Sequence, residues 1–346
     1  MRTCGEMRRL VLLALVATAV LLGPVACTRR VGPHPGQLEL GMVTDIGGLG
    51  DKSFNDSAYR GLLAARKSLG AYIQVLQSRS AADYQPNLIA LSSGHFNMVY
   101  AIGFLMSRDL DDVAKGNPQQ HYAIVDAVVD EPNVLSVTFK EQDGSFLAGA
   151  LAAMVSKTHR IAFMGGQDIP LLRKFEAGYI AGAREIDPSI HVDVKYIGSF
   201  EDVAAGKEIA GVLYNSGDDI IYAAAGKAGL GVMDEVKNHR HDFVIGVDSN
   251  QDSLVPGKVL TSMVKRVDVA VFDVARAIQL HQPLQGHLEL GLKDGAISLT
   301  NFAYTKHEIG KANLARLAAI KRAIIDGRIV PPDTREALST FKTVPL

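Results

Sequence analysis

The feature that most constrains the fold is a regular alternation of short apolar runs with longer amphipathic stretches, which begins at Leu38. The short runs are rich in Val, Ile, Leu and Tyr, which is typical of buried strands. The stretches between them repeat their apolar residues with a helical period. Strands separated by helices in this way indicate βαβ units and therefore parallel sheets.

The pattern predicts ten strands, at residues 38–43, 72–76, 98–101, 121–125, 134–138, 161–164, 191–196, 220–224, 243–247 and 260–263. It predicts helices that include residues 53–69, 145–156, 171–185, 204–215, 229–238 and 267–280. Ten strands are too many for one compact doubly wound unit. The sequence therefore predicts two α/β lobes, which agrees with the two domains expected for a chain of 346 residues.

The expected change of lobe lies near residues 156–160, after the helix at 145–156. Residues 38–157 together with about 266–295 are expected in the N-terminal lobe. Residues 158–265 and part of the C-terminal segment are expected in the second lobe. A basic helix at 314–326 is expected to pack on one lobe, and we assign it no chemistry.

The balance of charged residues argues against one class of function. The chain has 36 Lys and Arg residues against 37 Asp and Glu residues, which gives a formal net charge of -1. A nucleic-acid-binding protein would normally present a basic field, so this balance argues against that class.

The N-terminal segment resembles a secretion signal. Arg8 and Arg9 precede an apolar run at residues 10–22, which is too short to span a membrane comfortably. Small residues then lead to Cys27, as in bacterial lipoprotein signals, where that cysteine is acylated. Pro24 stands where such signals usually have leucine three residues before the cysteine.

The expected mature protein begins at Cys27. Residues 1–26 are expected to be removed as the signal, and residues 27–37 to form a tether. Removal of Cys4 leaves Cys27 as the one cysteine, so we expect no internal disulfide. Acyl chains such as palmitate on Cys27 would hold the protein on the extracytoplasmic face of the cell membrane, in a periplasm or at the cell surface.

Polar, aromatic and glycine residues follow several predicted strands. They are Asp45, Phe54 and Asn55 after the first strand, Asp126 after the fourth, Phe200 after the seventh, Gly226 after the eighth, Asp248 after the ninth and Lys265 after the tenth. Ligands of doubly wound sheets bind beyond the carboxyl ends of the strands. We therefore expect these residues to lie around one cleft between the lobes.

The residues just named, apart from Asp126, belong to motifs that resemble the basic membrane protein (BMP) family, which includes purine nucleoside receptor lipoproteins of spirochaetes. The opening motif is VTDIGG at 43–48 with DKSFN at 51–55. The further matches are EQDGSFLAG at 141–149, IAFMGG at 161–166, FEAGY at 175–179, GSF at 198–200, IYAAAG at 221–226, IGVDS at 245–249 and TSMVKRVD at 261–268. The similarity extends from about residue 38 to beyond residue 300.

The resemblance implies a type I periplasmic-binding-protein fold, in which two lobes joined by a hinge close on a nucleoside and deliver it to the permease of an ABC importer. It implies that Phe54 and Phe200 sandwich the base, and that Asp45 and Asn55 bond its polar edge. The residues implied to contact the ribose are Asp126, Gly226, Asp248 and Lys265. The expected ligand is inosine, guanosine or adenosine, bound by a monomer without a metal or cofactor and without catalysis.

The chemistry of these residues supports the same roles, although each has a plainer explanation. Aromatic rings stack on bases, and carboxylates accept hydrogen bonds from hydroxyl and N–H donors. Phe54 could instead belong to the core, and the aspartates could cap turns or helices. A sugar receptor of the same fold, a nucleoside-hydrolysing enzyme and a surface adhesin or signalling receptor therefore remain alternatives.

Overall fold

The computed structural model describes residues 33–284 and 286–344. The predicted signal and Cys27, with most of the predicted tether, lie outside these residues. The chain divides into a short unit that ends at Pro35 and a large unit, Gly36–Leu346, which contains the helices and strands of both lobes. No helix within the described residues has the length and apolar character needed to cross a membrane.

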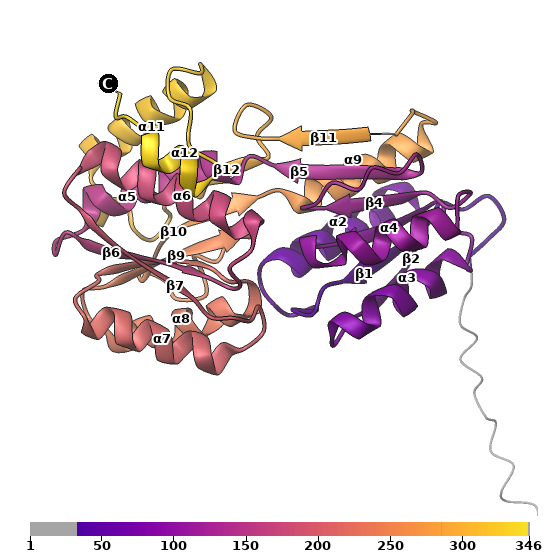
Figure 1. The fold of residues 1–346 in the computed structure, drawn as a ribbon, viewed down its shortest axis with the longest axis horizontal. Coiled ribbons are helices and arrows are strands. Elements are labelled where there is room, and N and C mark those ends of the chain that lie inside the picture. Colours follow the sequence, from indigo (N-terminus) through magenta and orange to yellow (C-terminus); the bar gives the residue numbers. More distant parts are fainter. Residues whose placement is uncertain (1–32, 285, 345–346) are drawn as a thin grey trace, which may run out of the picture. The chain divides into compact units, whose positions relative to one another are not determined.

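The first sheet has the strand order β11-β5-β4-β3-β1-β2, and all its strands run parallel. Its strands are β1 (Glu39–Thr44), β2 (Tyr72–Gln77), β3 (Met98–Ile102), β4 (Tyr122–Val125), β5 (Val134–Phe139) and β11 (Gly286–Leu290). The helices α2 (Phe54–Leu69) and α9 (Val267–Gln279) pack together on this lobe. The helices α3 (Tyr84–Ser92) and α4 (Ser107–Gly116) lie on the other face, because the chain reverses its direction across the sheet after β2 (Figure 1).

The second sheet repeats this arrangement in the order β12-β10-β9-β8-β6-β7. Its strands are β6 (Arg160–Gly165), β7 (His191–Tyr196), β8 (Ile220–Ala224), β9 (Phe243–Asp248), β10 (Val259–Lys265) and the antiparallel β12 (Ile297–Leu299). The helices α5 (Glu141–Val155) and α6 (Pro170–Ile186) pack on each other, as do α7 (Val203–Asn215) and α8 (Gly229–Glu235). Near the C-terminus, α11 (Lys311–Ile325) packs on α5, and α12 (Arg335–Thr340) packs on α6.

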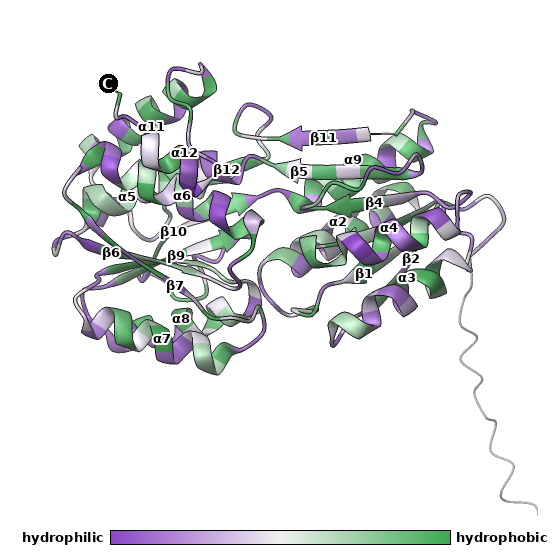
Figure 2. Cartoon of the chain, in the orientation of Figure 1, coloured by the Kyte–Doolittle hydropathy of each residue, from purple (hydrophilic) through white to green (hydrophobic). Residues whose placement is uncertain are grey.

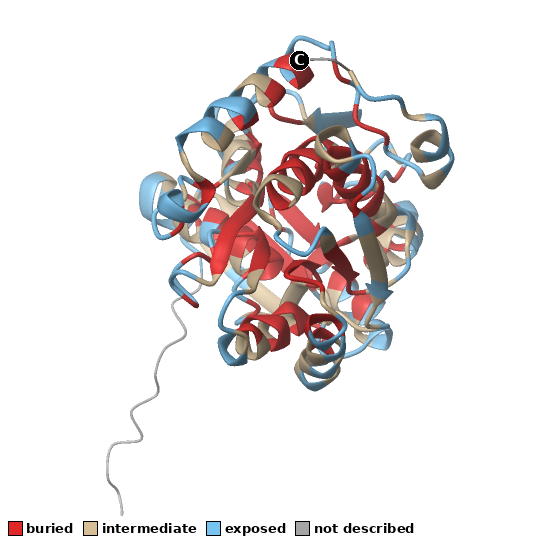
Figure 3. Cartoon of the chain, turned by 90° about the vertical axis from the view of Figure 1, so that its left-hand side faces the viewer, coloured by how far each residue is buried: buried red, intermediate tan, exposed pale blue. Residues whose placement is uncertain are grey.

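The inner strands are buried on both faces. Every residue of β3 and of β8 is buried, which explains why these strands appear in the sequence as unbroken apolar runs. Figure 2 shows hydrophobic residues along the inner strands such as β4, and Figure 3 shows buried residues surrounded by exposed ones. Local sequence signals mark where helices begin and end. Gly70 terminates α2 with φ 69°, and Pro170 is the first residue of α6.

Within the described part of the chain three segments cross between the lobes, and they lie side by side. The first joins β5 to α5 at Lys140, the second joins β10 to α9 at Arg266, and the third joins β11 to β12. The Lys140 amide donates a hydrogen bond to the Leu290 carbonyl at 2.8 Å, and the Arg266 amide donates to the Ala296 carbonyl at 2.8 Å. These bonds make the crossing segments one hinge region.

The predicted fold class is confirmed, and all ten predicted strands form. Two short strands, β11 and β12, were not predicted. Helix α5 begins at Glu141 and packs on α6, β10 and β12, so it lies with the second sheet. The chain thus changes lobe at Lys140, whereas the expected boundary was residue 157, because α5 buries its apolar residues against α6.

Candidate functional site

A cleft lies where the carboxyl ends of the two parallel sheets face each other. In each sheet the connections leave in opposite directions from two adjacent strands, β1 and β3 in the first and β6 and β8 in the second. Such switch points form crevices in doubly wound sheets, and ligands bind there. About 580 Å³ of space lies between the residues that line the cleft when its open mouth is included.

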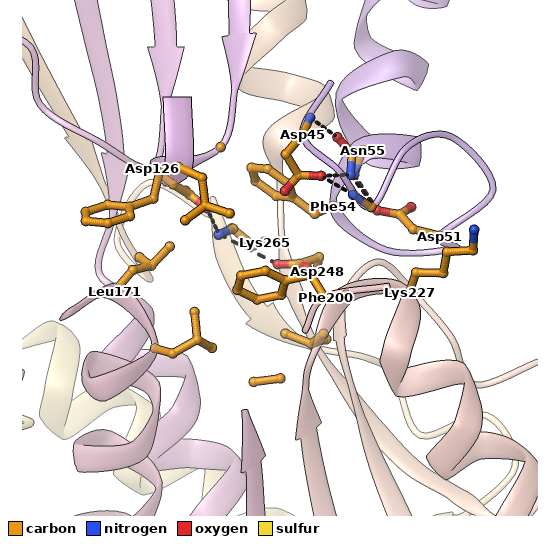
Figure 4. Close-up of a pocket in the computed structure, with 18 of the residues that line it drawn as sticks. Asp45, Asp51, Phe54, Asn55, Asp126, Leu171, Phe200, Lys227, Asp248 and Lys265 are labelled. Atoms are coloured by element: carbon orange, nitrogen blue, oxygen red, sulfur yellow. Dashed lines mark hydrogen bonds and ion pairs between the residues drawn. The ribbon is translucent and has the colours of Figure 1, made fainter. Parts of the chain in front are cut away.

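All eight predicted ligand-binding residues line this cleft, and Figure 4 labels each of them except Gly226. They are Asp45, Phe54, Asn55, Asp126, Phe200, Gly226, Asp248 and Lys265. Residues that are far apart in the sequence and lie in both lobes are thereby brought together.

Two aromatic rings stand in the walls. Phe54 begins α2 and is 8% exposed, while Phe200 follows β7 and is half-buried. The Phe200 ring lies so close to Gly166 that a Cβ there would be 2.3 Å from it. Within the described residues no ring–ring contact joins Phe54 to Phe200. The rings therefore offer separate apolar surfaces, although Phe54 also belongs to the buried core.

Asp45 and Asn55 form a bonded pair beside Phe54. Asp45 Oδ1 accepts hydrogen bonds from the Gly47 amide at 2.9 Å and from Asn55 Nδ2 at 2.7 Å. Asn55 Nδ2 also donates to Asp51 Oδ2 at 3.1 Å, so Asn55 orients the Asp45 carboxylate. Burial raises the pKa of Asp45 to about 6, with the charge of Asp51 adding to the increase and the bond from Asn55 opposing it.

Lys265 forms the floor of the cleft and is 2% exposed. Its Nζ lies 2.6 Å from Asp126 Oδ2, 3.6 Å from Glu141 Oε1 and 3.7 Å from Asp248 Oδ1. Burial alone would lower the pKa of Lys265, but the surrounding carboxylates outweigh it and raise that pKa above its ordinary value. The buried ammonium group therefore stays charged at neutral pH.

Asp126 and Asp248 are held in a backbone conformation that few residues other than glycine adopt. Their φ angles are 73° and 61°, and each lies at or directly after the end of a strand, β4 or β9. Such strain is typical of functional sites, where the surrounding structure enforces it. Burial raises the pKa of Asp126 to about 7, with Lys265 opposing the increase.

Gly226 closes the cleft on the side of the second lobe. Its φ is 55°, and a Cβ there would lie 3.4 Å from the Phe200 carbonyl oxygen. A side chain would therefore be strained at this position, whereas glycine leaves backbone exposed to a ligand.

The cleft also contains residues that the sequence reasoning did not select. They include Asp51, Gly103, Lys227 and an apolar wall formed by Phe104, Leu105, Ile169, Leu171, Leu172 and Phe175. Asp51 is the first residue of the motif at 51–55, so the sequence could have identified it as a residue of the cleft. Leu171 and Phe175 lie on a helix whose burial against a cleft cannot be distinguished in sequence from burial in a core. Among the described residues, no three or more His, Cys, Asp or Glu side chains are placed to hold a metal ion.

Comparison with known proteins agrees with this geometry. The family model described as "ABC transporter substrate-binding protein PnrA-like" (Bmp) matches residues 38–330. The chain is 35% identical to a CD4+ T-cell-stimulating antigen of Listeria innocua, over 94% of this chain and 98% of the relative. It is 36% identical to the "ABC transporter nucleoside-binding protein BmpA" of Lactococcus lactis, over 92% and 97% of the two chains.

The solved structures show the same architecture. An ABC transporter solute-binding protein from Aeropyrum pernix superposes with a TM-score of 0.80 at 26% identity, over 88% of this chain and 96% of that one. The predicted family and non-enzymatic role are confirmed, because the matched family comprises substrate-binding proteins of transporters. This chain therefore belongs to the Bmp family of PnrA-like ABC transporter substrate-binding proteins.

Proposed function

We propose that this protein captures purine nucleosides in the cleft and delivers them to an ABC importer. The observation that carries the proposal is the convergence of two aromatic walls, one carboxylate edge and one buried lysine–carboxylate floor on the same cleft. In this arrangement Phe54 and Phe200 flank the base. Asp45, oriented by Asn55, accepts a hydrogen bond from a ring or amino N–H group at the edge of the base.

The ribose is placed over the floor. Ionised carboxylates are acceptors, so Asp126 and Asp248 suit ribose hydroxyl groups, and Lys265 suits a ribose oxygen. Gly226 lets backbone approach the sugar. A nucleoside is favoured over a free sugar because stacking contributes about 1–3 kcal/mol per base. The name of the Lactococcus lactis relative, a nucleoside-binding protein, supports the same choice.

The proposal includes a membrane anchor at Cys27 and a monomeric binding unit. The observation that motivates the membrane anchor is the apolar run at residues 10–22 followed by small residues and Cys27. Intact-mass analysis of membrane-extracted protein is expected to show an acylated Cys27 at the N-terminus. An unmodified N-terminus would refute the anchor without affecting the binding function.

Isothermal titration of residues 28–346 with nucleosides, free bases and ribose tests the binding function. We expect stoichiometric binding of at least one of inosine, guanosine and adenosine with micromolar or tighter affinity, and weaker binding of ribose. Binding of ribose alone would favour a sugar receptor. Release of free base from the bound nucleoside would favour a hydrolase, and no binding of any nucleoside would refute the proposal.

A further inference from the structure

Glu141 is a fully buried carboxylate that the proposed nucleoside contacts do not use. It is 0% exposed, and it begins α5 directly after the first crossing segment. Its Oε2 lies 2.8 Å from Lys174 Nζ, and its Oε1 lies 3.6 Å from Lys265 Nζ. A carboxylate in such a position is costly to bury, so its placement between two lysines requires an explanation.

The partners of Glu141 connect it to two different crossing segments of the hinge region. Lys265 ends β10, where the second crossing segment begins. Lys174 lies in α6 and donates a hydrogen bond of 2.7 Å to the Phe139 carbonyl, at the end of β5. Glu141 therefore links the two crossing segments that carry the floor of the cleft.

The surroundings of Lys265 show why its position depends on charge. The ammonium group lies 4.8 Å from the centroid of the Phe54 ring and 5.5 Å from those of Phe139 and Phe175. Aromatic faces attract a cation but do not direct its N–H bonds, whereas carboxylates do. Glu141 is the one of the three neighbouring carboxylates that does not line the cleft.

We propose that Glu141 is a positioning residue that holds the Lys265 ammonium group at the ribose end of the cleft and connects it through Lys174 to the hinge. The inference rests on the proposed nucleoside-binding function. Glu141 balances the positive charge of Lys265 from outside the cleft, so that Asp126 and Asp248 keep free oxygen positions for a ligand. Loss of its charge would therefore weaken contacts with the ribose and leave contacts with the base intact.

The test compares Glu141→Gln with Glu289→Gln in titrations with inosine and with its free base, hypoxanthine. Glu289 is a matched control, because it pairs with Lys140 of the first crossing segment at 3.7 Å but is half-exposed and does not contact Lys265. We expect Glu141→Gln to weaken inosine binding about tenfold or more and hypoxanthine binding less than about threefold. We expect Glu289→Gln to leave both affinities unchanged.

The pH profile separates positioning from general damage. The charge of Glu141 helps to keep the pKa of the buried Asp126 above its ordinary value. In Glu141→Gln the fall of inosine affinity on acidification is therefore expected at lower pH than in the wild type. Glu141→Asp, which keeps the charge, is expected to restore the wild-type profile in part.

Several outcomes would overturn the role of Glu141. One is a folded Glu141→Gln variant with wild-type inosine affinity and pH profile, and another is an equal loss of inosine and hypoxanthine binding. If Glu141→Gln does not fold, Lys174→Met is expected to show the same selective loss for inosine, and failure of both variants to fold would make the cluster a structural ion pair. A wild-type protein that binds no nucleoside would instead refute the proposed function.

Discussion

At the scale of single residues, the cleft separates apolar faces from charged edges. Phe200 supplies a ring without belonging to the fully buried core, so its replacement tests stacking more cleanly than replacement of Phe54. We expect Phe200→Leu to weaken purine nucleoside binding by about 1–3 kcal/mol, measured by titration calorimetry. Phe200→Tyr, which keeps a ring, should bind nearly as well as the wild type. Equal affinities of the leucine variant and the wild type would exclude stacking on Phe200.

Asp218, a buried carboxylate that does not line the cleft, makes stability depend on pH. Asp218 is 1% exposed, and neither of its side-chain oxygens accepts a hydrogen bond from the described residues. Burial, with the charge of Asp193, raises the pKa of Asp218 to about 7. Because the folded-state pKa exceeds that of the unfolded chain, this group costs stability increasingly as pH rises from about 4 to 7, and fully above that.

Asp218→Asn removes this cost. We expect the variant to be more stable than the wild type by roughly 1–2 kcal/mol at pH 8, and to lose that advantage near pH 4. Thermal unfolding at several pH values measures the difference, with the exposed Asp333 as the control in Asp333→Asn. A stability gain that does not change with pH would show that the pKa of Asp218 is not the cause.

The site residues could be predicted from sequence to the extent that they follow strands. Asp45, Asp126 and Asp248 stand at strand ends, where parallel topology places functional groups. Their bonding could not be predicted, because it depends on contacts across the molecule, such as the 2.7 Å bond from Ser53 Oγ to Asp248 Oδ2. Glu141 belongs to the motif at 141–149, but nothing in that motif shows that it faces Lys265.

At the scale of elements, helices α5 and α6 approach until their backbones touch. A Cβ at Gly182 would lie 1.9 Å from the Phe146 carbonyl oxygen, and one at Gly149 would lie 1.9 Å from the Tyr179 carbonyl oxygen. We expect Gly182→Ala to destabilise the protein by about 2–4 kcal/mol in denaturant unfolding, because the helices must separate.

A glycine at the end of another helix provides the control. Gly116 is the last residue of α4, and a Cβ there would meet nothing within 4 Å. Gly116→Ala is therefore expected to be neutral or stabilising by about 0.5 kcal/mol. Similar destabilisation by both substitutions would contradict close packing as the reason for Gly182.

The elements were predictable where they are long or fully buried. Runs such as the one that forms β8 consist of apolar and β-favouring residues throughout, so their prediction succeeded. The edge strand β11 is mostly exposed and β12 has three residues, so neither has the buried apolar pattern. The lobe to which α5 belongs depends on the packing partner of its apolar residues, which sequence periodicity does not identify.

At the scale of the whole binding unit, α2 of the first lobe is hydrogen-bonded to the loop after β9 of the second. Arg60 Nη2 donates to Ser249 Oγ at 2.9 Å, and Ser249 Oγ donates to the Ser53 carbonyl at 2.7 Å. These bonds favour the arrangement in which the lobes face each other across the cleft. Arg60 itself does not line the cleft, so its effect on binding must act through the lobes.

We expect Arg60→Ala to raise the dissociation rate of a bound purine nucleoside about three- to tenfold in stopped-flow experiments, with little change in the association rate. Arg66→Ala is the matched control, because Arg66 is exposed in the last turn of the same helix. An equal change in both variants would indicate an effect of net charge rather than of contact between the lobes.

The most direct measurement of the central claim is a crystal structure of the protein with inosine. The predicted result is one nucleoside in the cleft, with its base between Phe54 and Phe200, an edge N–H group within hydrogen-bond distance of Asp45, and its ribose against Asp126, Asp248 and Lys265. A nucleoside bound elsewhere, or bound with its ribose away from Lys265, would contradict the account.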